Sequence, residues 1–346
     1  MQKGKRKLLI KILASAVFVA GFFMCANDSL AHNKFIFIHH STGGYWIANA
    51  SSAGGGLGSA LDNAGIYVRN IGYDMDNNDF DPPQNSTIAD TTDIGHWWLW
   101  FADTTLQANS VARRDNVLDG LNGVYETTNK NVSRGSYTTT MTDPGGENDI
   151  IMIKSCYPSA NIYTDNGTTF VQMRGRASDY TTGGLNVNTV SNVKALYNSL
   201  LDYFKTRTDK IFIISFTPPL LEASTTQERA NNARSVANWL VNEWLQGENW
   251  ENKNVYVFDQ FNVLTHANNH HTYSGGQVVH YTDPASGNFL VYPTGSSDNH
   301  PSGAGHQKAT ADFVPLLQHW IATYEEFAAG AGDVTAPARP SGLAVL

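Results

Sequence analysis

Apolar and polar positions follow two patterns along this chain. Short runs that are almost wholly apolar are typical of strands buried on both faces of a parallel sheet, and they cover residues 35–39, 66–71, 150–153, 210–216 and 254–258. Longer segments repeat apolar residues every three or four positions, as amphipathic helices do, and they cover residues 190–204, 227–245 and about 304–327. Strands that alternate with helices predict an α/β fold, a three-layer doubly wound domain with a five-stranded parallel sheet.

Two long polar segments, residues 73–148 and 162–187, interrupt this alternation. Both are too long to be ordinary connections, so we expect insertions at the strand ends, where they would shape a substrate site. The first contains a tryptophan cluster, Trp97, Trp98 and Trp100. These indoles either stack on sugar rings or pack the insertion onto the domain.

The two ends of the chain differ from its body. Residues 1–31 combine four early basic residues with a 15-residue apolar stretch, residues 12–26, which is typical of a signal peptide and short for a membrane span. Ser29 and Ala31 suit cleavage just before His32, so a secreted or periplasmic protein is expected. An uncleaved anchor and a lipoprotein at Cys25 are the alternatives.

After a small-residue linker that starts near residue 327, the chain ends in VTAPARPSGLAVL, whose prolines and glycine exclude a helix. This ending resembles the first strand of a fibronectin type III module. The expected organisation is a signal peptide over 1–31, one domain over 32–328, and a linker with a truncated fibronectin-like start over 329–346.

Charge and cysteine content exclude some classes. The 346-residue chain carries −8, and loss of residues 1–31 removes five of its 23 basic groups and one of its 31 acidic groups, which leaves −12. Nucleic acid and anionic membranes both need a cationic face, so neither is an expected partner. The two cysteines, Cys25 and Cys156, cannot form a disulfide framework.

Candidate chemistry lies at two points that a parallel sheet would bring to one edge. Ser41 follows the first strand directly and is followed by small residues, so its hydroxyl is expected at the sheet rim, beside its own backbone N–H as an oxyanion donor. His300 stands before Pro301 and the last helix, where it could act as general base. The alternatives are a helix-capping serine and a surface histidine.

These positions resemble the SGNH (GDSL-type) hydrolase superfamily, in which the nucleophile follows the first strand and a late DxxHP segment supplies Asp and His. The most specific match is DNHPSGAGHQKATADF, residues 298–313, and IFIISFTPPL, residues 211–220, resembles the family's fourth strand. The resemblance implies a flavodoxin-like sheet, Ser41 as nucleophile, His300 as base and Asp298 as the residue that orients it. Asp298 stands two positions before the histidine and not three, so a triad and a Ser-His dyad both remain open.

Other family positions are less clear. The family's block II glycine has Gly72 as its candidate, and the GxND after the third strand is absent, so Asn161 would have to supply the amide of the oxyanion hole. The residues expected to contact substrate are His40, Lys154, Tyr157 and Trp46.

Further chemistries are open at four places. His39 and His40, together with His300 and Asp298, could bind a metal and activate water. The acidic segment 74–81 could bind calcium, although it lacks the glycine and glutamate of an EF-hand. Cys156 is either a buried packing residue or an alternative nucleophile. The remaining histidines are expected to be scattered surface residues, and they are His270, His271, His280 and His306.

The sequence therefore predicts a secreted serine esterase that needs no cofactor and hydrolyses short acyl esters, with acetylated polysaccharide as the favoured substrate. Two other classes remain open. One is a catalytically inactive carbohydrate-binding module on a hydrolase fold, and the other is a metal-dependent hydrolase that uses His39 and His40.

Overall fold

A computed structural model describes residues 32–72, 94–102, 117–119, 121–122, 135–167, 181–182, 185–293 and 298–330. The predicted leader (1–31), the acidic segment 74–81 and the fibronectin-like ending lie outside these ranges. None of the helices in the described ranges is both long enough and apolar enough to cross a membrane.

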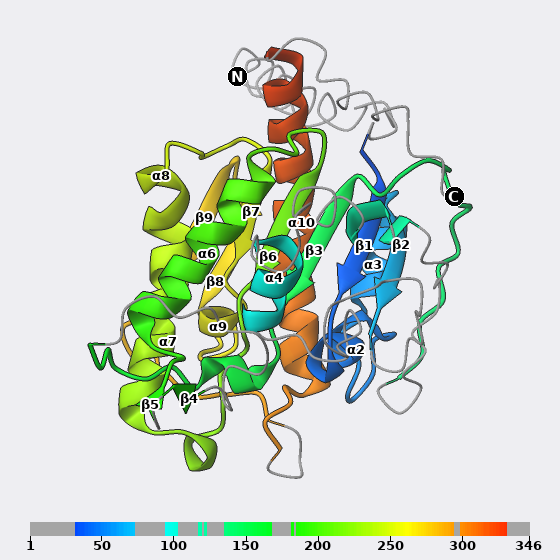
Figure 1. Cartoon of the computed structure of the whole chain (residues 1–346). Helices are drawn as coiled ribbons and strands as arrows, with labels where there is room; N and C mark the ends of the chain where they lie inside the picture. The colour runs from blue at the N-terminus through cyan, green and yellow to red at the C-terminus, as the bar shows by residue number, and fades with distance from the viewer. Residues whose placement is uncertain are drawn as a thin grey trace, which may run out of the picture. The chain divides into compact units, whose positions relative to one another are not determined.

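The central element is a five-stranded sheet in which all neighbouring strands are parallel, in the order β2-β1-β3-β6-β7 (Figure 1). Its strands are β1 (Lys34–Ile38), β2 (Tyr67–Ile71), β3 (Ile150–Lys154), β6 (Ile211–Ser215) and β7 (Val255–Phe258). Every residue of these strands is buried. The prediction of an α/β fold with a five-stranded parallel sheet is confirmed, and this strand order is compatible with a flavodoxin-like fold.

Helices cover both faces of the sheet (Figure 1). The helices are α2 (Ser41–Ile47), α3 (Leu57–Asn63), α4 (Ile94–Phe101), α6 (Val190–Phe204), α7 (Gln227–Trp239), α8 (Leu245–Gly247), α9 (Gln260–Val263) and α10 (Gly303–Gly330). A π-helical turn, η5 (Leu240–Trp244), joins α7 to α8, and two 3₁₀ turns are η2 (Tyr157–Ala160) and η4 (Glu222–Ser224). The helix α10 ends at Gly330, three residues beyond the end expected for the last amphipathic segment.

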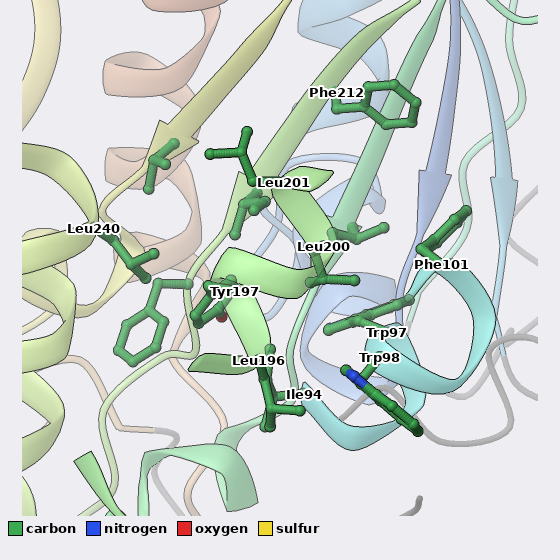
Figure 2. Close-up of a cluster of buried hydrophobic side chains, with 14 of the residues drawn as sticks. Ile94, Trp97, Trp98, Phe101, Leu196, Tyr197, Leu200, Leu201, Phe212 and Leu240 are labelled. Atoms are coloured by element: carbon green, nitrogen blue, oxygen red, sulfur yellow. The ribbon is translucent and has the colours of Figure 1, made fainter. Parts of the chain in front are cut away.

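Alternation along each strand divides the core between the two faces. On one face, Ile36, Ile151 and Phe212 belong to a cluster with α4, α6 and α7 (Figure 2). On the other face, Phe37 and Phe258 pack against Trp46 of α2, and Phe258 also packs against Phe313 of α10. The sheet is therefore held between two apolar layers, and α2 and α10 share the second.

Two small antiparallel pairs complete the described elements. They are β4 (Thr181–Thr182) with β5 (Leu185–Asn186), and β8 (His270–Ser274) with β9 (Gln277–Tyr281). The turn of the second pair is Gly275-Gly276, and both glycines have positive φ, 60° and 82°. This is the backbone that a two-residue hairpin turn requires and that glycine adopts without strain.

Candidate active site

Ser41 and His300 meet at the carboxyl edge of the sheet. Ser41 is the first residue of α2, close behind the end of β1, and His300 lies just before α10 begins. Because α2 and α10 cover the same face of the sheet and contact each other, the two side chains converge although they are 259 residues apart in sequence.

A continuous hydrogen-bonded chain joins Ser41, His300 and Asp298. The Nε2 atom of His300 lies 2.9 Å from the Oγ of Ser41, and its Nδ1 atom lies 2.6 Å from the Oδ2 of Asp298. When the Nδ1 N–H donates a hydrogen bond to the carboxylate, Nε2 is free to accept a hydrogen bond from the Ser41 hydroxyl. Ser41 and His300 are buried, whereas 41% of the Asp298 side chain is exposed.

The loop that carries His300 is held by hydrogen bonds to the backbone of neighbouring segments. Asn299 accepts a hydrogen bond from the N–H of Leu221 at 2.9 Å, which ties the loop to the segment that follows β6. Gly303 donates its N–H to the carbonyl of Ser52 at 3.0 Å, and a Cβ atom at this position would lie only 2.1 Å from the Ser51 carbonyl oxygen. Only glycine allows this approach, so the start of α10 is locked against the loop that follows α2.

Two tyrosines hold the imidazole of His300 from its sides. The rings of Tyr45 and Tyr157 lie 5.3 and 5.2 Å from the His300 ring, both in T-shaped contacts. Both tyrosines are half-buried. The substrate contact of Tyr157 stays a prediction. Tyr45 was missed, and its sequence signal is that it stands one helical turn after Ser41.

Backbone N–H groups are the best candidates for oxyanion donors. Ser41, Thr42 and Gly43 begin α2, so their N–H groups have no intrahelical acceptor, and none has a backbone or side-chain acceptor among the described residues. Gly72 is also buried, and its N–H likewise lacks an acceptor in the described ranges. It abuts the His39 ring, where a Cβ atom would lie 2.9 Å from Cε1. The role of Gly72 stays a prediction.

Asn161 forms its hydrogen bonds away from the nucleophile candidate. Its Oδ1 atom accepts a hydrogen bond from Thr225 at 2.8 Å, and its backbone N–H donates to the carbonyl of Pro158. Within the described part of the chain, no hydrogen bond joins Asn161 to Ser41. The 3₁₀ turn η2 therefore directs Oδ1 of Asn161 toward the segment before α7, and the role of its side-chain amide N–H as an oxyanion donor stays a prediction.

His39 supports the turn that carries the nucleophile candidate. Burial lowers the pKa of its imidazole to about 4, so the ring is neutral at ordinary pH. Its ring nitrogens lie 3.0 Å from the carbonyl of His40 and 3.2 Å from Oδ1 of Asn70. The ring packs against Gly43, where a Cβ atom would come within 2.3 Å of the Cβ of His39.

The metal hypothesis finds little support in this geometry. Both ring nitrogens of His39 face protein oxygens, and the described residues contain no group of three or more His, Cys, Asp or Glu side chains arranged to hold a metal ion. His40 is half-buried and stands at the N-cap of α2.

The side chains of Trp46 and Lys154 are enclosed in the protein interior. The Trp46 indole is fully buried, stacks on Phe258 and donates to Thr310 at 3.0 Å. Lys154 is also fully buried, and its Nζ atom donates to Oγ1 of Thr42 and to the carbonyl of Ser155. The expectation that these two side chains contact substrate is wrong, because neither has an exposed surface.

The tryptophan cluster of the first insertion is part of the core. Trp97, Trp98 and Trp100 are buried on α4, which packs against α6 (Figure 2). Trp97 also donates to the hydroxyl of Ser155 at 2.9 Å. Of the two interpretations of this cluster, packing of the insertion onto the domain is the one that fits.

The remaining histidines are not all surface residues. His271 and His306 are fully enclosed, and burial lowers the pKa of both. His280 lies 2.7 Å from the buried carboxylate of Asp259, at the carboxyl end of β7. Burial alone would raise the pKa of Asp259, but hydrogen bonds from His280 and Asn262 hold it below its usual value. The expectation of scattered surface histidines is wrong for His271, which packs against Phe258 of β7 and Trp320 of α10, and for His306, which stacks on Tyr45.

Cys156 lies directly beside the nucleophile candidate. Its Sγ atom is buried and 3.6 Å from the Oγ of Ser41. A thiol at this distance fills space next to the hydroxyl and offers at most a weak hydrogen bond.

Cys156→Ala should therefore change turnover on a short acyl ester by less than about tenfold, because the loss is a packing effect near the nucleophile. Steady-state assays with a thermal melt would measure it. A loss of about a thousandfold in a folded variant would transfer the nucleophile role to the thiol.

Comparison of the chain with known protein families, with curated proteins and with solved structures finds no match.

Proposed function

We propose that this protein is a serine esterase of the SGNH type. The observation that carries the proposal is the hydrogen-bonded chain from Ser41 through His300 to Asp298. A serine hydroxyl, an imidazole and a carboxylate in this order form a nucleophile, a general base and an orienting group. The order of the elements supports the same proposal, since Ser41 follows the first strand and His300 precedes the last helix.

The reaction would proceed in two halves. Ser41 Oγ attacks the ester carbonyl carbon while its proton moves to Nε2 of His300, and the carbonyl electron pair moves onto oxygen. Collapse of this intermediate breaks the bond to the alcohol, which leaves with the proton from His300 and produces an acyl-enzyme. Water then attacks the acyl-enzyme by the same route and releases the acid. Asp298 stabilises the imidazolium through its contact with Nδ1.

The developing oxyanion needs donors at the sheet edge. The N–H groups of Ser41 and Thr42 at the start of α2 suit this role, and Gly72 is the third candidate. None of these N–H groups already donates to an acceptor among the described residues. Asn161 stays a further candidate, because Thr225 binds its Oδ1 atom and not the amide N–H that would donate.

A short acyl ester on a carbohydrate is the proposed substrate, and the proposed location is secreted or periplasmic. The half-buried Tyr45 and Tyr157 beside His300 support a carbohydrate, because aromatic rings suit the apolar faces of sugars. The predicted signal peptide supports the location. The tryptophan cluster of the first insertion is buried, so it supports neither the proposed substrate nor the proposed location.

A fluorophosphonate probe tests the proposed function. We expect the wild-type protein to be labelled at Ser41, which peptide mapping would locate, and His300→Ala to be labelled much more slowly. Labelling should persist in EDTA, because no step requires a metal. An unlabelled wild-type protein that binds acetylated glycan would favour the binding module, and activity lost in EDTA and restored by zinc would favour the metal-dependent hydrolase.

A further inference from the structure

Lys154 is a buried cation directly beneath the start of α2. It is the last residue of β3, and alternation along this strand turns it toward the face that α2 and α10 cover. Its side chain has no exposed surface. The Nζ atom donates to Oγ1 of Thr42, the residue after Ser41, and at 3.1 Å to the carbonyl of Ser155.

No carboxylate pairs with this ammonium within the described residues. The contrast with Lys34 is direct, because Lys34 is a buried lysine at the opposite end of the same sheet. The Nζ of Lys34 lies 3.0 Å from Asp143 and donates to the carbonyl of Gly146 at 2.7 Å. A buried charge without a counter-charge is costly for the folded state, so Lys154 is not a stabilising residue.

The groups around Lys154 are hydroxyls, imidazoles and the Cys156 thiol, and the thiol partly opposes the lowering of the Lys154 pKa by burial. Thr42 belongs to α2, and Ser215 lies beside Lys154 in the register of β3 and β6. His39, at the end of β1, and His306, on α10, both feel its charge, which lowers their pKa further below the value that burial already imposes. The remaining ionisable neighbours are Cys156 and, acting on His306, His300.

Two of these neighbours carry buried polar atoms without partners. The hydroxyl of Ser215 has no hydrogen-bond partner among the described residues, and neither ring nitrogen of His306 has one. The surroundings of Lys154 are therefore polar, yet no carboxylate among the described residues pairs with the ammonium. Such surroundings are suited to a transient negative charge that forms nearby.

We infer that Lys154 is a positioning residue for the reaction at Ser41: its ammonium holds Thr42 in place and supplies the positive charge that stabilises the oxyanion formed beside it. The inference rests on the proposed function and deepens it. Lys154 does not contact substrate, and it acts through Thr42 at the start of α2.

The charge of Lys154 also predicts a pH dependence. Burial lowers the pKa of its ammonium to about 8. Turnover should therefore fall as the pH rises through about 8, since the neutral amine no longer stabilises the oxyanion. In the unfolded chain the lysine keeps its proton up to about 10.5. Between these two values the unfolded state binds more protons, so the stability of the folded protein rises with pH.

Lys154→Met tests the inference with p-nitrophenyl acetate as the probe substrate. We expect kcat at pH 7 to fall about 10- to 100-fold with KM changed less than about threefold, and the loss of turnover near pH 8 to disappear. The melting temperature should stay equal or rise, because methionine removes an uncompensated charge at similar volume. This gain should shrink as the pH rises above about 8, where the wild-type lysine loses its proton.

Lys34→Met is the matched control and should give the opposite result. It breaks the ion pair with Asp143, which is left with Arg69 alone, so the melting temperature should fall while kcat of the folded protein stays unchanged. If Lys154→Met keeps wild-type kcat, or loses stability together with kcat and retains the loss near pH 8, Lys154 is an ordinary structural residue. These results overturn the inference alone, whereas a wild-type protein that neither turns over the ester nor is labelled by fluorophosphonate overturns the proposed function with it.

Discussion

Ser41→Ala and His300→Ala should each lower turnover on a short acyl ester by at least about a thousandfold. The hydroxyl and the imidazole share one hydrogen bond of 2.9 Å, so removal of either ends the same proton transfer. The double variant should then lose little more than either single variant, because residues that act as one unit are not additive. Steady-state kinetics on the three proteins would measure this.

The comparison needs proteins that are still folded. Ser199→Ala is a suitable control, because its hydroxyl only donates back to the carbonyl of Ala195 on α6. It should keep full turnover. Circular dichroism and thermal melting should match across all four variants. Losses that multiply in the double variant would mean that Ser41 and His300 act independently, and a nucleophile-base pair would then be excluded.

The strands could be predicted from sequence because parallel strands are buried on both faces. In a chain with alternating helices, a short apolar run such as residues 150–153 is typical of such a strand and too short for a helix. The hairpin β8-β9 was missed, although its signal is present. Gly275-Gly276 stands between two strand-like segments, and that dipeptide is typical of a two-residue hairpin turn.

The convergence of Ser41 and His300 could be predicted because the carboxyl ends of parallel strands share one edge. The burial of Lys154 and Trp46 could not, because it depends on which side chains α10 brings over the same face. The direction of Asn161 depends on the 3₁₀ turn η2, which a sequence pattern does not determine. The contact between Asp298 and His300 depends on the loop conformation, and it forms in spite of the unusual spacing.

Asp298→Ala should lower turnover by about tenfold to a thousandfold, less than the loss at Ser41 or His300. In the proposed mechanism the carboxylate orients the imidazole through the 2.6 Å contact with Nδ1. Because 41% of its side chain is exposed, water can enter the space that alanine leaves and partly replace the carboxylate. Added formate should restore part of the activity for the same reason. The kcat of the variant with and without formate would measure both effects.

Asp298→Asn separates orientation from charge. The amide can donate to Nδ1 of His300, which places the ring proton on Nε2 and blocks acceptance of the Ser41 hydroxyl. We therefore expect asparagine to cost at least as much as alanine, and formate to give no rescue, because the amide still fills the site. If both variants keep wild-type turnover at unchanged melting temperature, Asp298 has no part in the reaction. Ser41 and His300 would then work as a dyad, and the short contact in the loop would be structural.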